Sequence, residues 1–338
     1  MVDISADVGI MMGGILMTKT ILQVENLKKY FPIKGGVLNR VENYVYAVDD
    51  ISFSVKERET FALVGESGCG KSTTGRSILR LIEPTSGSVY FDEMDILSLS
   101  KVGMRELRKD MQMVFQNPYS SLNPRMTVKN LLSEPLETHS DLEKGEIEDK
   151  VIEMVEKVGL SIQHLDRYPH QFSGGQRQRI SIARSIITNP KLVIADEPVS
   201  ALDVSIQSQI LNLLMELQKE LGLTMIFISH DLNVVRRISN SIAVMYLGSI
   251  VETGETEDIF RSPLHPYTEA LLSAVPSLDP LEKKKRTILQ GEIPSPVNPP
   301  EGCAFQTRCS RVMSLCRESK PSLREIQGGH QVACHLYK

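Results

Sequence analysis

The sequence predicts an α/β fold organised around a parallel sheet, and the order of its apolar segments supports that prediction. Apolar runs of strand length occupy residues 60–64, 191–195 and 224–229, and residues 204–221 between the last two have helical spacing. A glycine-rich segment joins the first run to a second helical pattern at residues 71–82. Because parallel strands need a crossover connection, usually a helix, this alternation favours helices packed over a parallel sheet. Alternating patterns at residues 21–27 and 48–55 indicate a β-rich entry region, which makes the β core mixed.

Length and charge limit the possible classes of protein. The 338 residues suggest roughly two domains, and 41% hydrophobic residues are enough for a buried core. The net charge is −4, from 38 basic and 42 acidic residues. The net charge therefore gives no electrostatic reason to expect nucleic acid as a partner.

The N-terminus carries an apolar stretch at residues 8–17 that could be mistaken for a membrane anchor. A spanning helix needs about 20 apolar residues, and Asp3 and Asp7 stand where a signal peptide would be cationic. We expect instead a disordered leader over residues 1–20, with Met17 as an alternative start.

Residues 65–72 read Gly-Glu-Ser-Gly-Cys-Gly-Lys-Ser, a complete phosphate-binding loop. Its glycines let successive backbone N–H groups turn toward phosphate oxygens at a helix N-terminus. Lys71 supplies a charge to the outer phosphates, and the Ser72 hydroxyl is placed to hold Mg²⁺. A glycine-rich turn without function would leave the flanking strand and helix patterns unexplained. The residues predicted to bind ATP here are Gly65, Glu66, Ser67, Gly68, Cys69, Gly70, Lys71, Ser72 and Thr73.

Two carboxylates, Asp196 and Glu197, follow the apolar run at residues 191–195. We expect Asp196 to contact Mg²⁺ directly or through water, and Glu197 to polarise the attacking water, because phosphoryl transfer to water needs an oriented nucleophile and neutralised charge. His230 follows the next apolar run, at residues 224–229, and could reach the terminal phosphate of the ATP bound in the loop. The alternative is an acidic turn at a strand end and a structural histidine.

The order of these motifs resembles the ATP-binding cassette (ABC) ATPases over about residues 21–255. The resemblance adds a signature segment, formed by Ser173, Gly174, Gly175 and Gln176, and two further nucleotide contacts, Gln116 and Asp203. It implies that two cassettes pair head to tail, so that each ATP lies between one phosphate loop and the other subunit's signature. The resemblance thus implies a second ABC ATPase subunit, which would be an identical copy or a sister chain.

The resemblance also implies an aromatic residue that stacks on adenine and a helical subdomain at about residues 117–175. Phe31 lies nearest to the expected position, with Tyr30 and Tyr46 as rivals. In transporters the helical subdomain receives a helix of a membrane subunit, and Gln116, a further ligand for Mg²⁺ and water, would connect it to the nucleotide.

Residues 261–268 read Arg-Ser-Pro-Leu-His-Pro-Tyr-Thr, and residues 291–296 read Gly-Glu-Ile-Pro-Ser-Pro. With these motifs the tail, residues 256–338, resembles the C-terminal extension of the oligopeptide and dipeptide importer ATPases. Its prolines favour extended and turn conformations, so we expect an appendage or lid. The implied protein is a peripheral ATPase on the cytoplasmic face of the cell membrane, which powers peptide import with two polytopic membrane permease subunits and an extracytoplasmic peptide-binding protein. A nickel or glutathione importer, or a soluble ABC ATPase without a transport role, is the alternative.

The tail contains four of the five cysteines, Cys303, Cys309, Cys316 and Cys334. Four thiols within about 30 residues of a cytosolic ATPase suit a metal site better than disulfides, although their gaps are wider than zinc normally prefers. The resemblance implies a [4Fe-4S] cluster on these four positions. A zinc site, to which His330 or His335 could contribute, and free thiols are the alternatives.

Overall fold

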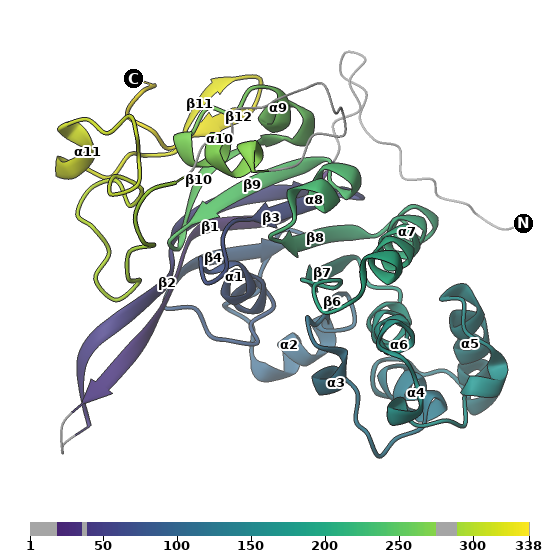
Figure 1. Cartoon of the computed structure of the whole chain (residues 1–338). Coiled ribbons are helices and arrows are strands. Elements are labelled where there is room, and N and C mark those ends of the chain that lie inside the picture. Colours follow the sequence, from purple (N-terminus) through teal and green to yellow (C-terminus); the bar gives the residue numbers. More distant parts are fainter. Residues whose placement is uncertain (1–18, 36–38, 275–288, 338) are drawn as a thin grey trace, which may run out of the picture.

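The computed structural model describes residues 19–35, 39–274 and 289–337, which form two sheets with helices around them (Figure 1). The predicted leader lies outside the described residues, except that Lys19 is exposed and Thr20 already begins a strand. Among the described residues, no helix is long and apolar enough to cross a membrane.

The larger sheet has the strand order β11-β12-β10-β9-β3-β8-β7-β6. The strands from β9 to β6 are parallel, whereas β10, β11 and β12 join the edge in antiparallel pairs. The strands are β3 (Thr60–Val64), β6 (Met111–Val114), β7 (Leu192–Asp196), β8 (Thr224–Ser229), β9 (Ser241–Tyr246), β10 (Ser249–Glu255), β11 (Arg324–Gln327) and β12 (His330–Val332). The predicted α/β class is confirmed.

The central strands are buried on both faces because alternate side chains enter two different cores. In β3, Ala62 and Val64 pack into the core on one side of the sheet, and Phe61 and Leu63 pack into the core on the other. Strands buried in this way read as continuous apolar runs, which is why the sequence signal at residues 60–64 and 224–229 was clear.

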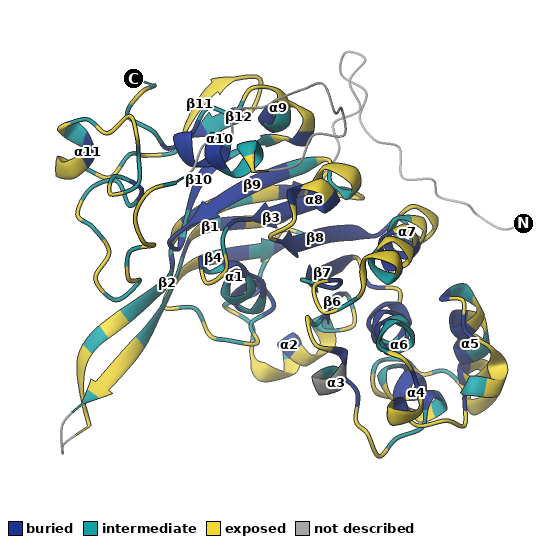
Figure 2. Ribbon diagram, viewed as in Figure 1, coloured by how far each residue is buried: buried dark blue, intermediate teal, exposed yellow. Residues whose placement is uncertain are grey.

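The smaller sheet has the order β2-β1-β4-β5 and closes the second core. Its strands are β1 (Thr20–Gly35), β2 (Arg40–Lys56), β4 (Ser86–Phe91) and β5 (Met94–Asp95). The first two extend well beyond the predicted runs at 21–27 and 48–55, and their far ends project as a long hairpin (Figure 1). Figure 2 shows that this projecting part is mostly exposed, so no apolar alternation marked it in the sequence.

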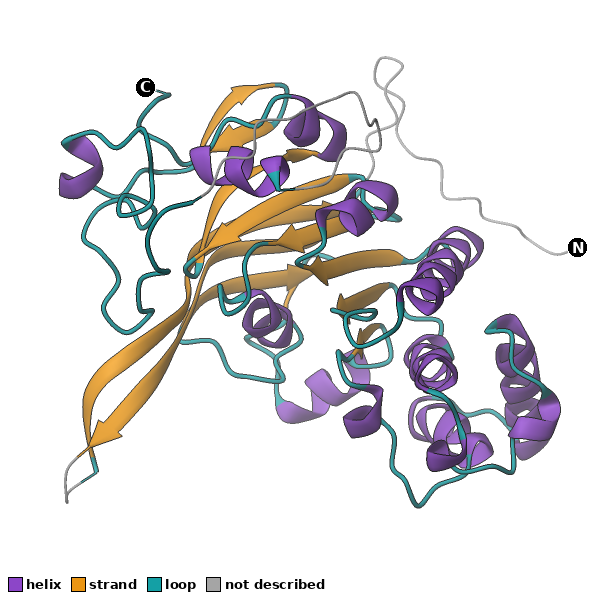
Figure 3. Cartoon of the chain, in the orientation of Figure 1, coloured by secondary structure: helices purple, strands orange, loops and turns teal. Residues whose placement is uncertain are grey.

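Helices cover the larger sheet and form a separate group beyond β6 (Figure 3). The helix α1 ends at Ile78, four residues before the end of the predicted helical pattern. The helical insertion expected at about 117–175 contains α3, α4, α5, η1 and η2. The helices are α1 (Lys71–Ile78), α2 (Lys101–Leu107), α3 (Pro118–Ser121), α4 (Val128–His139), α5 (Lys144–Lys157), η1 (Ile162–His164), η2 (Pro169–Gln171), α6 (Gly174–Ile186), α7 (Val204–Leu221), α8 (Leu232–Ile238), α9 (Thr256–Arg261), α10 (Pro266–Ser273) and α11 (Leu315–Glu318).

The tail is built into the fold, so the expectation of an appendage was wrong. Strand β12 pairs with β10, which makes the tail the edge of the larger sheet. Tyr267 and Phe305 are buried in the same core as Ala62 and Val64. The prolines do keep most of the tail out of regular structure, but its apolar side chains still fill the central core.

Candidate active site

The phosphate loop runs from the end of β3 to the start of α1, as the motif requires. Gly70 occupies the position just before the helix with φ +107°, a left-handed conformation that favours glycine. A Cβ atom at Gly70 would also overlap the carbonyl oxygen of Ala47 in β2. The loop is therefore packed against the smaller sheet at a point where only glycine fits.

Lys71 is buried at the centre of this loop. Its Nζ atom donates to the carbonyl oxygens of Gly65, at 2.8 Å, and Glu66, at 3.0 Å. Ser72 and Thr73 follow in the first turn of α1, while Ser67 and Gly68 are exposed at the tip of the loop. The positive charge of Lys71 thus lies in the loop beside a helix N-terminus, an arrangement that attracts anions.

Asp196, the last residue of β7, is fully buried. Its Oδ1 atom accepts a hydrogen bond from the Ser72 hydroxyl at 2.7 Å, while its Oδ2 atom accepts none from the residues that the structure describes, and the Arg76 guanidinium lies 3.7 Å from it. Burial raises the pKa of the Asp196 carboxyl. A buried carboxylate oxygen without a hydrogen bond, next to a hydroxyl, is a donor set that fits a hard cation such as Mg²⁺.

Glu197 brings together the ends of three neighbouring strands. Its Oε2 atom accepts a hydrogen bond from Gln116 Nε2 at 2.8 Å, and its Oε1 atom lies 3.2 Å from His230 Nδ1. Gln116 follows β6, Glu197 follows β7 and His230 follows β8, and these strands are adjacent and parallel. Because the carboxyl ends of parallel strands meet at one edge, residues far apart in sequence form a single polar cluster there.

The signature segment begins α6. The Ser173 hydroxyl accepts from the Gln176 N–H at 3.3 Å, and the Gln176 side chain accepts from the Ser173 N–H at 3.1 Å, which together form a capping box. Ser173 is exposed, and so is Asp203, which precedes α7. The signature hydrogen bonds stabilise its own helix start and leave its outer surface open.

The three aromatic candidates for adenine lie together on β1 and β2. Tyr30 and Tyr46 are paired in register with ring centroids 4.7 Å apart, and the Tyr30 hydroxyl donates to Asp49 at 2.5 Å. Phe31 is half-buried one residue further along the hairpin, with the Lys29 amine 4.8 Å from its ring centroid. Tyr46 directly precedes Ala47, which contacts the phosphate loop at Gly70.

The four tail cysteines do not form the metal centre that the resemblance implied. All four are free thiols, and the described residues contain no group of three or more Cys, His, Asp or Glu side chains that could hold a metal ion. Burial raises the pKa of Cys303 to about 11 and also raises the pKa of Cys309 and of Cys334. The predicted [4Fe-4S] cluster at Cys303, Cys309, Cys316 and Cys334 is therefore wrong.

The zinc alternative has no support either, because the described residues contain no candidate metal-binding group, and both candidate histidines have other partners. His330 Nε2 lies 2.7 Å from the buried carboxylate of Glu252, and His335 Nε2 lies 2.8 Å from the carbonyl oxygen of Ser319. The Glu252 carboxylate also accepts from the N–H groups of Leu264 and His265, so it ties β10 to β12 and to the start of α10.

Two tail residues that sequence reasoning missed contact the phosphate loop. Arg308 pairs with the side chain of Glu66, and the Tyr267 hydroxyl accepts from the Glu66 N–H. They lie 242 and 201 residues from Glu66, and no local pattern marks either contact.

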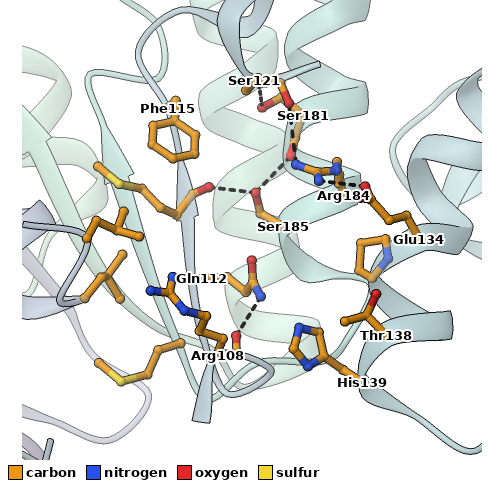
Figure 4. Close-up of a pocket in the computed structure, with 15 residues that line it drawn as sticks. Arg108, Gln112, Phe115, Ser121, Glu134, Thr138, His139, Ser181, Arg184 and Ser185 are labelled. Carbon is orange, nitrogen blue, oxygen red and sulfur yellow. Dashed lines mark hydrogen bonds and ion pairs between the residues drawn. The ribbon is translucent and has the colours of Figure 1, made fainter. Parts of the chain in front are cut away.

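A cavity of about 270 Å³ separates the edge strand β6 from the helical group (Figure 4). Gln112 and Phe115 line it from the strand side, and Arg184 of α6 pairs with Glu134 of α4 at 2.9 Å on the helical side. Since Phe115 directly precedes Gln116, the cavity lies one residue along the chain from the cluster around Glu197.

A phosphate loop, paired acidic residues at a strand end and a capped glycine signature on one parallel sheet define the ATP-binding cassette class of ATPases. The ABC transporter family model matches residues 48–200, and the model for the C-terminal region of oligopeptide/dipeptide transporters matches residues 251–316.

Individual relatives agree along almost the whole chain. The oligopeptide transport ATP-binding protein AppF of Bacillus subtilis (strain 168) is 52% identical over 322 residues, which cover 94% of this chain and 98% of the relative. The dipeptide transport ATP-binding protein DppF of Escherichia coli (strain K12) is 50% identical over 318 residues, which cover 94% and 95%. A solved dimeric ATP-binding cassette, in a post-hydrolysis state bound to ADP and Pi, matches with a TM-score of 0.63 at 30% identity, covering 70% of this chain and 99% of that one.

The chain therefore belongs to the ATP-binding proteins of ABC transporters, in the oligopeptide/dipeptide branch. It is an ATPase, and the prediction of this family and activity is confirmed.

Proposed function

We propose that this protein powers the import of peptides through a membrane ABC transporter. The observation that carries the proposal is the similarity to dipeptide and oligopeptide transport ATP-binding proteins, which extends beyond the cassette into the C-terminal region at residues 251–316. A nickel or glutathione importer remains as an outcome of the test below. The protein would act at the cytoplasmic face of the cell membrane through its membrane partners.

In the proposed mechanism the phosphate loop holds the triphosphate of ATP. Lys71 leaves the carbonyl oxygens of Gly65 and Glu66 and turns its charge to the outer phosphates, which its flexible side chain permits. Ser72 and Asp196 would hold Mg²⁺, with Gln116 nearby as a further ligand, and the ion would neutralise charge on the phosphates. One of the aromatics Phe31, Tyr30 and Tyr46 would stack on adenine.

Glu197 is placed to act on water at the end of β7. Its carboxylate oxygens meet Gln116 on one side and His230 on the other, so its orientation is fixed before ATP arrives. We infer that Glu197 polarises the attacking water and that His230 holds Glu197 and reaches the terminal phosphate.

A second ATPase subunit would complete the site. The segment of Ser173, Gly174, Gly175 and Gln176 has its open surface at the N-terminus of the 13-residue helix α6, and Asp203, which directly precedes α7, is also exposed. Helix N-termini favour anions, so this segment would grip the phosphates of an ATP held by the partner subunit. The partner would be a sister chain or a second copy of this one.

The membrane partners would be two permease subunits, supplied with cargo by an extracytoplasmic peptide-binding protein. A short helix of a permease would enter the cavity beside Phe115, where Gln112 and the ion pair of Arg184 with Glu134 offer polar contacts (Figure 4). Movement of that helix would reach Glu197 through Gln116, the residue that follows Phe115.

The test is purification of the full-length chain with its membrane partners, followed by ATP-driven uptake into sealed vesicles. We expect membrane subunits to copurify and labelled dipeptides or oligopeptides to accumulate only with ATP. Accumulation of nickel or glutathione but not of peptide would overturn the peptide cargo. Recovery of the chain only with ribosomes or DNA would overturn the transport role.

A further inference from the structure

Every polar group of Glu66, the second residue of the phosphate loop, has a partner. Its carboxylate accepts two hydrogen bonds from the Arg308 guanidinium, Nη1 to Oε2 at 2.7 Å and Nη2 to Oε1 at 3.1 Å. Its N–H donates to the Tyr267 hydroxyl at 3.0 Å, and its carbonyl oxygen accepts from Lys71 Nζ at 3.0 Å. Glu66 therefore connects two tail residues directly to the lysine of the loop.

The tail side of this contact is closely packed and shielded from water. The Arg308 side chain is 7% exposed and that of Glu66 is 25% exposed. The Arg308 guanidinium lies 5.9 Å from the Tyr246 ring, which packs at 4.7 Å against Tyr267 and at 5.2 Å against Phe305. Because a forked pair with little exposure loses less to solvent screening than a surface pair, the contact can constrain the loop.

Because Glu66 lies in the phosphate loop, its contact with Arg308 and Tyr267 can affect nucleotide binding. The Glu66 carbonyl is one of two that hold Lys71 before ATP arrives. With its N–H and its carboxylate both held from the tail, the Glu66 peptide keeps its orientation when Lys71 turns to the phosphates. The loop then loses less conformational freedom when it binds ATP.

We propose that Arg308 and Tyr267 are positioning residues of the ATPase, which hold the phosphate loop in its nucleotide-ready conformation through Glu66. Because coupling between two sites is reciprocal, ATP in the loop also strengthens the attachment of the tail at residues 289–337. The C-terminal extension thereby becomes a sensor of the nucleotide state. This inference rests on the proposed role of the phosphate loop.

The test uses the full-length chain with Arg308→Gln, and measures the Kd of a fluorescent ATP analogue, the KM and kcat of hydrolysis, and protease cleavage of the tail with and without ATP. Loss of a charge-assisted pair should raise Kd and KM about tenfold, with a smaller change in kcat. Arg308→Lys should have Kd and KM values between those of the unaltered chain and those of Arg308→Gln, since lysine keeps the charge but not the forked guanidinium. ATP should protect the tail of the unaltered chain from protease and should not protect that of Arg308→Gln.

Arg311→Gln is the matched control, because Arg311 pairs with Glu269 in the same part of the tail and not with the loop. It should bind ATP like the unaltered chain. Equal weakening by Arg311→Gln and Arg308→Gln would show general damage to the tail and would overturn the proposal.

Glu66→Gln removes the loop's carboxylate from the same ion pair, and it tests the proposal if Arg308→Gln does not fold. It should weaken ATP binding, and adding Arg308→Gln to it should cause little further loss, since both changes remove one interaction. Unaltered Kd and tail protection in Glu66→Gln would refute the inference. Lys71→Ala distinguishes the proposed role of the phosphate loop from the proposed role of the tail. If Lys71→Ala abolishes ATP binding while Glu66→Gln has no effect, the loop binds ATP as proposed and only the positioning role of the tail is refuted.

Discussion

Replacement of Glu197 by glutamine tests the proposed chemistry most directly. Glutamine has nearly the same shape, and its carbonyl oxygen can still accept the hydrogen bond from Gln116 that the structure shows at 2.8 Å. The contact with His230, 3.2 Å in the structure, can persist through the other atom of the amide. What the change removes is the negative charge and the basicity at the edge of the sheet. We therefore expect ATP affinity to stay the same while turnover falls.

The size of the fall follows from the role assigned to the carboxylate. A positioned base contributes about 10²- to 10⁴-fold to a rate, which corresponds to about 3 to 5 kcal/mol of activation free energy. The assay is steady-state phosphate release beside equilibrium binding of ATP, and the paired subunits should be trapped with ATP between them. Glu257→Gln is the control, since Glu257 is an exposed carboxylate on α9 paired with Arg236. Turnover of Glu197→Gln at the rate of the unaltered protein would refute the role of Glu197.

Three further predictions concern the buried carboxylates and the signature. Burial raises the pKa of Asp196 above its unfolded value, so its ionised form costs stability at neutral pH, and this cost disappears as the pH falls through the folded pKa. Asp196→Asn should therefore melt a few degrees higher than the unaltered protein at neutral pH without nucleotide, by about 1 kcal/mol, and a lower melting temperature would contradict this. Glu252→Leu leaves three hydrogen-bond donors, of Leu264, His265 and His330, without their acceptor, which should cost up to about 9 kcal/mol in denaturant unfolding at about 1 to 3 kcal/mol for each. A loss of less than about 1 kcal/mol would show that the tail is not held through Glu252. Gly175→Val in the signature helix puts a Cβ atom 2.5 Å from Ile206 Cγ2. It should abolish ATP hydrolysis by the paired subunits, while a single chain should still bind ATP. Hydrolysis at the normal rate would exclude the signature segment from the shared ATP site.

Local patterns in the sequence were sufficient to predict the residues of the phosphate loop and the strands beside it. Each of these features depends on neighbours in the chain: glycines before a helix, or an apolar run buried on both faces. The cluster of Gln116, Glu197 and His230 could also be anticipated, because the rule that parallel strands end at one edge converts positions in sequence into a shared place.

The tail could not be predicted in the same way, because its structure depends on contacts across the whole chain. The grouping of four cysteines in the tail suggested a metal site and the family resemblance implied an iron–sulfur cluster, but Cys303 and Cys309 pack against the core, and the described residues contain no candidate metal-binding group. The contact of Arg308 with Glu66 joins residues separated by 242 positions, and although Glu66 belongs to the phosphate-loop motif, no pattern in the sequence marks Arg308 as its partner. Proline content described the backbone of the tail correctly but gave no information on the sheet edge that it joins.

Asp196 and Glu197 show how one change of backbone direction gives two adjacent carboxylates different environments. Asp196 ends a buried strand and is fully enclosed with Ser72, which suits a group that holds a cation. Glu197 has φ +45°, a left-handed conformation that is uncommon outside glycine, and its N–H is held by the carbonyl oxygen of Ile228 in β8 at 3.0 Å. The alternation of the strand is broken at this residue, so the Glu197 side chain, 13% exposed, meets Gln116 and His230 at the open edge of the sheet. The cost of that conformation is offset by the hydrogen bond to β8, and strain held in this way is typical of functional sites.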